Sequence, residues 1–206
     1  MAKPKPAKCV YNLATDMPEV PIPDAPVVAA EAAKPGQVAS IRAWVRDIIV
    51  SLGISAFFII FLYQPVKVEG TSMLPGLEDQ ERIFINKFVY RWEPIAKGDI
   101  VVFRYPRDPS KSYIKRVIAG PGDRVVIDKG RVYVNGQLLQ EFYVPAQFVD
   151  YRSYPELRVP EDSYFVMGDH RSMSNDSRDF GPVEREHILG KAVLIYWPVD
   201  KLGLLR

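Results

Sequence analysis

Two kinds of hydrophobic pattern divide this chain. An uncharged apolar run extends from Ile48 to Tyr63 and is apolar on every face of a helix. Beyond it, polar and apolar residues alternate in short stretches bounded by glycine and proline, which is typical of β-strands. The pattern therefore predicts one long apolar helix followed by a mainly β domain.

The apolar run is slightly shorter than the roughly 20 residues of a full membrane span. The segments 43–45 and 64–66 extend its apolar character, and Trp44 and Tyr63 occupy the positions of interfacial aromatic residues. We therefore predict a transmembrane anchor over 41–66. A buried helix of a soluble protein and a cleaved signal peptide are the alternatives. The segment 63–68 offers no small-x-small cleavage site for the latter.

The chain before the anchor is rich in proline, alanine and lysine and shows no helical or strand period. Such a segment buries too little apolar surface to offset its ordering entropy. We predict a disordered tail over 1–40, the anchor over 41–66 and a mainly β domain over 67–206. A smaller inserted β lobe is expected over about 128–162.

Six further stretches carry the strand pattern. They are 82–88, 100–105, 113–119, 124–127, 163–167 and 191–197. Between 131 and 139, Asn135-Gly136 separates two short apolar runs, and this pair tolerates the positive φ angles of a tight type I′ turn. We expect a hairpin there, within coiled sheets that mix parallel and antiparallel strands.

Composition removes several classes of function. The formal net charge is +2, and no dense block of lysine and arginine suggests a nucleic-acid partner. Cys9 is the only cysteine, so neither an internal disulfide nor a cysteine-based metal site is possible. His170 and His187 are the only histidines, which limits both metal binding and serine–histidine catalysis. We expect no metal and no organic cofactor.

Three polar segments carry the candidate chemistry. The first, 70–75, contains Ser72 and lies just beyond the apolar run; the second, 113–117, sets Lys115 among strand-like residues. The third, 168–178, is dense in polar groups. A serine hydroxyl needs a nearby base to act as a nucleophile. A lysine can be that base where burial disfavours its charged form.

In this order behind a single anchor, the three segments resemble the type I signal peptidases, peptidase family S26. The resemblance runs from about Val66 to Tyr196. It implies that Ser72 is the nucleophile and Lys115 the general base. It also implies the coiled mixed β fold with its inserted lobe.

The third segment would support this pair. The resemblance implies that the Ser174 hydroxyl hydrogen-bonds the lysine amine and that Asp176 and Arg178 form a structural ion pair. Asp169 is the acidic residue that opens this motif. His170 stands where asparagine is usual, and a serine–histidine mechanism through it stays open at the level of sequence.

The first segment would also stabilise the oxyanion and meet the substrate. Some relatives place a hydroxyl at the position of Gly70, which glycine lacks, so we expect the backbone N–H of Ser72 to be the main donor. Whether Thr71 contributes is open. Met73, Leu74 and Pro75 are candidate substrate-facing or membrane-facing residues, and Leu77 is a further candidate for the lipid surface.

The leading hypothesis is a membrane-bound serine endopeptidase that removes N-terminal signal peptides from exported preproteins. Small residues would be preferred at substrate positions −1 and −3. Its partners would be preproteins and the lipid bilayer; its oligomeric state is open. A self-cleaving repressor-type serine–lysine protease and an anchored, non-catalytic binding module are the alternatives.

Basic residues favour an orientation only slightly. Lys34, Arg42 and Arg46 precede the apolar run, against Lys67 and Arg82 after it. The resemblance supplies the stronger reason to place the N-terminus in the cytosol and 67–206 on the extracytoplasmic side.

Overall fold

The structure is a computed structural model that describes residues 37–205. Helix α1 runs from Gln37 to Leu62. The predicted tail lies outside the described residues up to position 36, and residues 37–40 begin α1 instead of ending the tail. Among the described residues, no helix combines the length and mean hydropathy of a membrane span. The anchor over 41–66 therefore stays a prediction.

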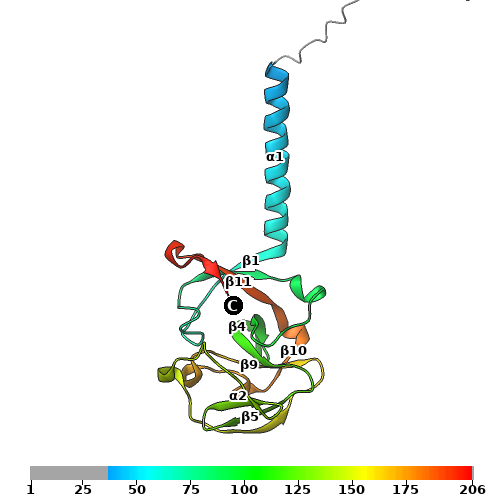
Figure 1. The fold of residues 1–206 in the computed structure, drawn as a ribbon. Coiled ribbons are helices and arrows are strands. Elements are labelled where there is room, and N and C mark those ends of the chain that lie inside the picture. Colours follow the sequence, from blue (N-terminus) through cyan, green and yellow to red (C-terminus); the bar gives the residue numbers. More distant parts are fainter. Residues whose placement is uncertain (1–36, 206) are drawn as a thin grey trace, which may run out of the picture. The chain divides into compact units, whose positions relative to one another are not determined.

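The β domain is built on an eight-stranded sheet in the order β1-β2-β11-β3-β4-β9-β10, with β12 paired to β11 (Figure 1). Its strands are β1 (Tyr63–Lys67), β2 (Arg82–Asn86), β3 (Ile100–Tyr105), β4 (Asp108–Ala119), β9 (Ser163–Met167), β10 (Val183–Glu184), β11 (Ile188–Trp197) and β12 (Gly203–Leu204). The alternating sequence pattern thus located the main strands of this sheet.

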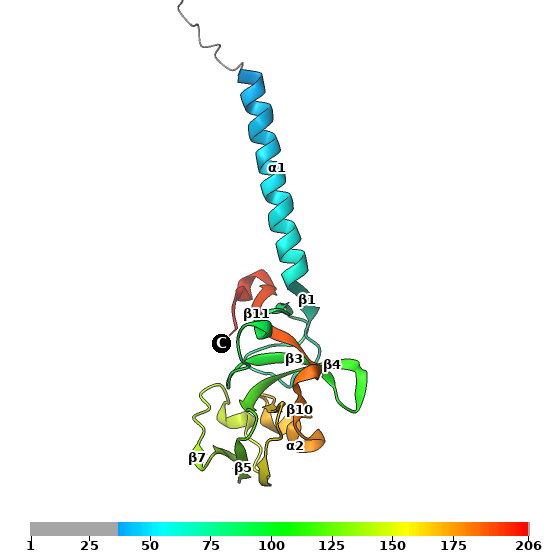
Figure 2. The same cartoon turned by 90° about the vertical axis from the view of Figure 1, so that its right-hand side faces the viewer.

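A second sheet has the order β7-β6-β5-β8. Its strands are β5 (Arg124–Asp128), β6 (Arg131–Val134), β7 (Gln137–Leu138) and β8 (Tyr154–Arg158). In both views, β5 lies at the end of the domain away from β11 (Figure 2). This sheet forms the inserted lobe, and it begins at Arg124, earlier than the predicted boundary at 128. The division of the chain into domains stays a prediction.

Short helical segments connect the strands. They are α2 (Ser177–Phe180) and the 3₁₀ turns η1 (Val89–Arg91), η2 (Ala146–Phe148), η3 (Arg171–Met173), η4 (Arg185–His187) and η5 (Val199–Lys201). The segment η3 and the start of α2 fall in the third polar motif, so that motif is a chain of tight turns.

Every strand pairing within residues 37–205 is antiparallel. The expectation of mixed sheets was therefore wrong. Short connections explain the difference, because β3 and β4 or β5 and β6 are joined by tight turns, whereas parallel neighbours need a long crossover. The predicted hairpin is present: Val134 pairs with Gln137, and Asn135 and Gly136 have φ angles of 53° and 79°.

Three hydrophobic clusters form the core. The first contains Val125 from the lobe and Phe165 from the large sheet, so it joins the two sheets. The third contains Met73 and Leu77, which are 2% and 0% exposed. The idea that these two side chains reach a lipid surface was therefore wrong. The turn over 71–77, closed by Leu77 N–H donating to Met73 O, directs both residues inward.

The inward position of Leu77 leads to a stability prediction. Leu77→Ala should lower the free energy of unfolding by about 2–5 kcal/mol, because it leaves a cavity in a fully buried cluster. The half-buried Leu74 is the matched control, and Leu74→Ala should cost less. Urea unfolding of the detergent-solubilised chain would measure both. An unchanged unfolding midpoint for Leu77→Ala would mean that this side chain is not part of the core.

Candidate active site

Ser72 lies in the turn that follows β1. Gly70 precedes it with a φ angle of +97°, a conformation that L side chains rarely adopt, and its N–H donates to Asp79 Oδ1 at 2.8 Å. The turn then closes through Leu74 N–H donating to Thr71 O at 3.2 Å. This local geometry leaves Ser72 half-buried at the surface of the domain.

Lys115 approaches the serine from β4. Its Nζ lies 2.6 Å from Ser72 Oγ and 3.0 Å from Ile114 O. Pairing of Lys115 with Val101 on β3 fixes the backbone position of the lysine. Its side chain is 4% exposed, so the amine is held against the nucleophile in a site with little water.

Burial lowers the pKa of Lys115 from 10.5 to about 8. The negative charges of Asp176 and Asp169 act in the opposite direction, and the charge of Arg178 adds to the lowering. Half of the amine is therefore neutral near pH 8 and a minority at pH 7, and this neutral form can accept a proton from Ser72 Oγ.

The pair lies in a cleft of about 380 Å³. Its lining comes from β1 and the segment after it, the turn over 71–77 that carries Ser72 (the nucleophile turn), β3, β4, η3 and the residues just after η3. The lining residues are Val66, Lys67, Val68, Glu69, Gly70, Thr71, Ser72, Met73, Val102, Ser112, Tyr113, Ile114, Lys115, Met173 and Asn175. Met73 therefore contributes to the cleft from within the core, whereas Leu74 and Pro75 do not line it.

Ser174 lies beside the pair without the predicted hydrogen bond. Its Oγ is buried and has no hydrogen-bond partner among the described residues, while the Lys115 amine bonds Ser72 and Ile114. Gly168 explains how Ser174 comes so close: a Cβ at this position would collide with Ser72 O and Ser174 Oγ. The third motif thus packs directly against the nucleophile turn.

Ion pairs surround the amine. Arg116 Nε and Nη2 donate to the two oxygens of Asp169 at 2.9 and 2.7 Å, and both side chains are buried. Asp176 and Arg178 form the ion pair that the sequence predicted, at 2.8 Å. Asp176 also caps α2, because its carboxylate accepts the Arg178 N–H.

His170 has a structural place in the site. Its backbone N–H donates to Ser72 O at 3.0 Å, and its ring lies 4.0 Å from that of Phe148, centroid to centroid. Its Nδ1 is buried without a hydrogen-bond partner in the described part of the chain. Since the lysine amine occupies the hydrogen bond to Ser72 Oγ, the geometry favours lysine over histidine as the base.

The oxyanion hole expected from the sequence stays a prediction, and the structure describes its candidate donors. The backbone N–H of Ser72 makes no hydrogen bond within residues 37–205, so it is available to a developing oxyanion. Gly70 offers no hydroxyl. Thr71 is exposed, and its hydroxyl has no partner among the described residues, so its contribution stays open.

Two contributors to the site were missed from the sequence. The Ile114 carbonyl accepts a hydrogen bond from the Lys115 amine, and the Asp79 carboxylate accepts one from the Gly70 N–H. A main-chain carbonyl leaves no signal in the residue type. The aspartate lies in a polar turn, where such residues are common for local reasons, so nothing distinguished it.

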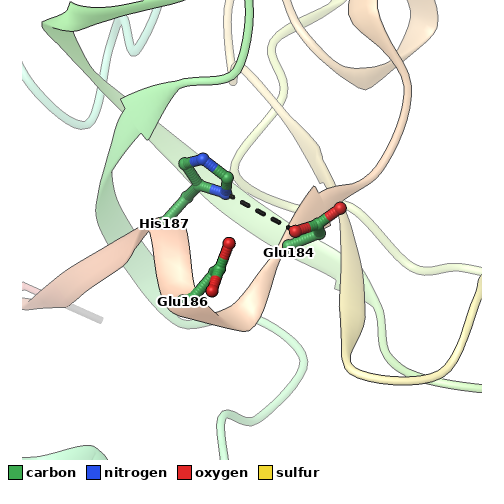
Figure 3. A group of neighbouring side chains, drawn as sticks. All are labelled: Glu184, Glu186 and His187. Atoms are coloured by element: carbon green, nitrogen blue, oxygen red, sulfur yellow. Dashed lines mark ion pairs between the residues drawn. The ribbon is translucent and has the colours of Figure 1, made fainter.

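One group of described side chains has the spacing of metal ligands. The ligand atoms of Glu184, Glu186 and His187 lie within 4.8 Å of one another, and His187 Nδ1 is 4.0 Å from Glu184 Oε2 (Figure 3). Both carboxylates are exposed, and none of the three residues lines the cleft at Ser72. The expectation that catalysis uses no metal stays a prediction.

A cleft serine hydrogen-bonded to a buried lysine is the arrangement that a serine hydrolase with a lysine base requires. Residues 41–197 match the family model "Signal peptidase, peptidase S26". The chain belongs to this family.

Named relatives agree with this assignment. Signal peptidase I of Leptolyngbya laminosa is 36% identical over 90% of this chain and 94% of its own length. Probable signal peptidase I-2 of Synechocystis is 39% identical over 80% of this chain and 75% of its own length. A crystal structure of a signal peptidase I from Enterococcus faecalis V583 matches 48% of this chain and 97% of its own, with 31% identity and a TM-score of 0.43.

The lowered pKa of Lys115 has a consequence for stability. Below about pH 8 the folded protein bears the full penalty of a buried charge, which fades as pH rises towards the unfolded value of 10.5. The difference between the two values corresponds to about 3 kcal/mol. Lys115→Met should therefore raise the free energy of unfolding at pH 7, and the gain should shrink by pH 10.

Urea unfolding at the two pH values would test this, with Lys191→Met as the control. Lys191 Nζ lies 2.6 Å from Asp99 Oδ1, so removing this amine should destabilise the fold at pH 7. A loss of stability for Lys115→Met at pH 7 comparable to that of Lys191→Met would mean that Lys115 is a charged structural residue.

Proposed function

We propose that this protein is a membrane-anchored serine endopeptidase that removes N-terminal signal peptides from exported preproteins. The observation that carries the proposal is the 2.6 Å contact between Lys115 Nζ and Ser72 Oγ in a site where the lysine is almost fully buried. Membership of the signal peptidase family supports the substrate class.

The mechanism is acyl transfer through Ser72. The neutral Lys115 amine takes the hydroxyl proton as Ser72 Oγ attacks the scissile carbonyl, and the oxyanion is stabilised by the Ser72 N–H. The tetrahedral intermediate collapses as the ammonium gives its proton to the leaving amine. A water, deprotonated by Lys115, then attacks the acyl-enzyme, and Ser72 regains its proton as the new carboxyl terminus leaves.

Strand edges supply the peptide-binding surface. Pairing of β4 with β9 begins only at Arg116, and β1 pairs with β2 alone, so the cleft lies between edges that no described strand covers. An extended substrate can add to such an edge through backbone hydrogen bonds. Side chains at substrate positions −1 and −3 then point to the same side. Branched residues such as Val68 and Ile114 line the cleft, which favours small substrate residues.

The anchor is proposed from the sequence. The run from Ile48 to Tyr63 contains no charge, and the described side chains Ile49, Leu52 and Phe57 within it are exposed. Lipid is the medium that would cover such side chains. We place the N-terminus in the cytosol and the β domain on the extracytoplasmic side, in line with the basic residues before the run.

The first test of the proposal concerns the catalytic pair. Ser72→Ala and Lys115→Ala should each abolish cleavage of a preprotein by the solubilised enzyme, because nucleophile and base act as a unit. Wild-type activity should rise with pH along a limb with its midpoint near 8, the pKa of Lys115. Product analysis by mass spectrometry would measure the rate and the cleavage position.

His170→Asn is the control for the serine–histidine alternative. It removes the imidazole and keeps the backbone N–H that binds Ser72 O, so activity should be largely retained. A loss equal to that of Ser72→Ala would restore histidine to the mechanism, and wild-type cleavage by a folded Lys115→Ala variant would remove lysine from it.

Orientation can be tested through the single cysteine. Cys9 should resist a membrane-impermeant maleimide in intact spheroplasts and react after permeabilisation, because we place it in the cytosol. The converse probe is Phe142→Cys in a Cys9→Ser background, at a residue that is 92% exposed in the β domain. This cysteine should react in intact cells. The opposite labelling pattern would reverse the orientation.

A further inference from the structure

A partly buried carboxylate from the inserted lobe binds a buried arginine of the third polar motif. Arg171 Nη1 and Nη2 donate to the two carboxylate oxygens of Glu141 at 2.8 and 2.5 Å. The side chains are 4% and 12% exposed. Such a two-pronged pair fixes the position and the plane of the guanidinium, which a single contact would not do.

Tyr143 completes this arrangement from the same loop. Its hydroxyl donates to Glu141 Oε1 at 3.0 Å, and the Arg116 guanidinium lies 4.1 Å from the centre of its ring. Burial, together with the Glu141 carboxylate, raises the pKa of Tyr143, so the phenol stays protonated and acts as a donor. Phe142, between the two, is 92% exposed and takes no part.

Arg171 connects Glu141 and Tyr143 with the segment that contacts the Ser72 turn. Its Nε donates to Gly168 O at 3.0 Å, and its own carbonyl accepts from Arg178 Nη2 at 2.7 Å. The same short segment supplies the His170 N–H that binds Ser72 O. A Cβ at Gly168 would collide with Ser72 O, so the two backbone segments are in close contact and we expect a shift of one to displace the other.

We propose that Glu141 and Tyr143 are positioning residues for the catalytic pair. By binding Arg171, the inserted lobe holds the segment 168–174 against the Ser72 turn. The segment in turn limits the access of water to the Lys115 amine. This role rests on the proposed function. It assigns to the lobe a part in the reaction beyond its share of the hydrophobic core.

The charge of Glu141 is necessary for this role. A buried guanidinium that loses its carboxylate keeps the cost of desolvation without the compensating attraction. Arg171 in a Glu141→Gln variant would therefore move towards water and release Gly168 O. A displacement of about 1 Å at a nucleophile can reduce a rate by roughly 100-fold.

The experiment compares three variants of the full chain in detergent. Glu141→Gln removes the charge at constant size, Tyr143→Phe removes one hydroxyl and keeps the ring, and Phe142→Ala is the matched control in the same loop. Glu141→Gln should lower kcat roughly 10- to 100-fold with little change in KM. The midpoint of its pH–rate profile should rise above that of the wild type. Tyr143→Phe should show the same changes to a smaller extent, and Phe142→Ala neither.

Hydrogen–deuterium exchange provides a readout that does not depend on activity. Peptides covering 70–77 and 168–176 should exchange faster in Glu141→Gln and Tyr143→Phe than in the wild type and Phe142→Ala. A fall in Tm with wild-type kcat, pH midpoint and exchange at 70–77 would reduce the lobe contact to a structural role and overturn the proposal. So would an equal effect of Phe142→Ala.

The two proposals fail in different ways. If the wild-type chain does not cleave a preprotein, the proposed function fails, and exchange at 70–77 still decides whether Glu141 positions the serine. If the wild type is active and the Glu141 and Tyr143 variants match it in kcat and pH midpoint, only the positioning role fails.

Discussion

Burial of one amine is the constraint on which the rest of the site depends. Lys115 can be a base near neutral pH only if desolvation outweighs the attraction of nearby carboxylates. Two of these, Asp169 and Asp176, raise its pKa, yet the balance falls to about 8 because burial is the largest effect. Each carboxylate is bound by its own arginine, at 2.7 and 2.8 Å. The ion pairs around the site therefore matter for the lysine because they neutralise charges that would otherwise hold it protonated.

The same constraint explains why the site is assembled from distant segments. A lysine side chain that projects from a strand is open to solvent unless other segments pack over it, so other parts of the chain must cover the amine. Ser72 lies 43 residues before Lys115, and the segment 168–174 packs against the turn that carries Ser72. Its contact with the turn is made by backbone groups, His170 N–H to Ser72 O, which works only because Gly168 carries no side chain. The inserted lobe then fixes this segment through Arg171.

Local pattern was sufficient for the strands and insufficient for their partners. The predicted strand at Ser163–Met167 has the same bounds in the structure, because branched and aromatic residues between turn signals favour a strand. The direction of each strand and the start of the lobe at Arg124 depend on which strands pair with each other. The residues of one strand do not specify its partner. At the site, the family resemblance predicted that Ser72 and Lys115 lie together, and they are in contact. The hydrogen bond expected of Ser174 was wrong in this structure, because side-chain rotation depends on packing from segments far along the chain.

Gly70 shows how the backbone limits the chemistry of the cleft. A hydroxyl at this position would give the oxyanion a second donor, and open space surrounds the place where a Cβ would lie. The obstacle is conformation, since a φ angle of +97° strains any other residue. The turn that brings Ser72 towards the lysine thus excludes a side-chain donor before it. We therefore expect the Ser72 N–H to serve as the main donor. It belongs to the residue whose carbonyl accepts the His170 N–H and lies against Gly168.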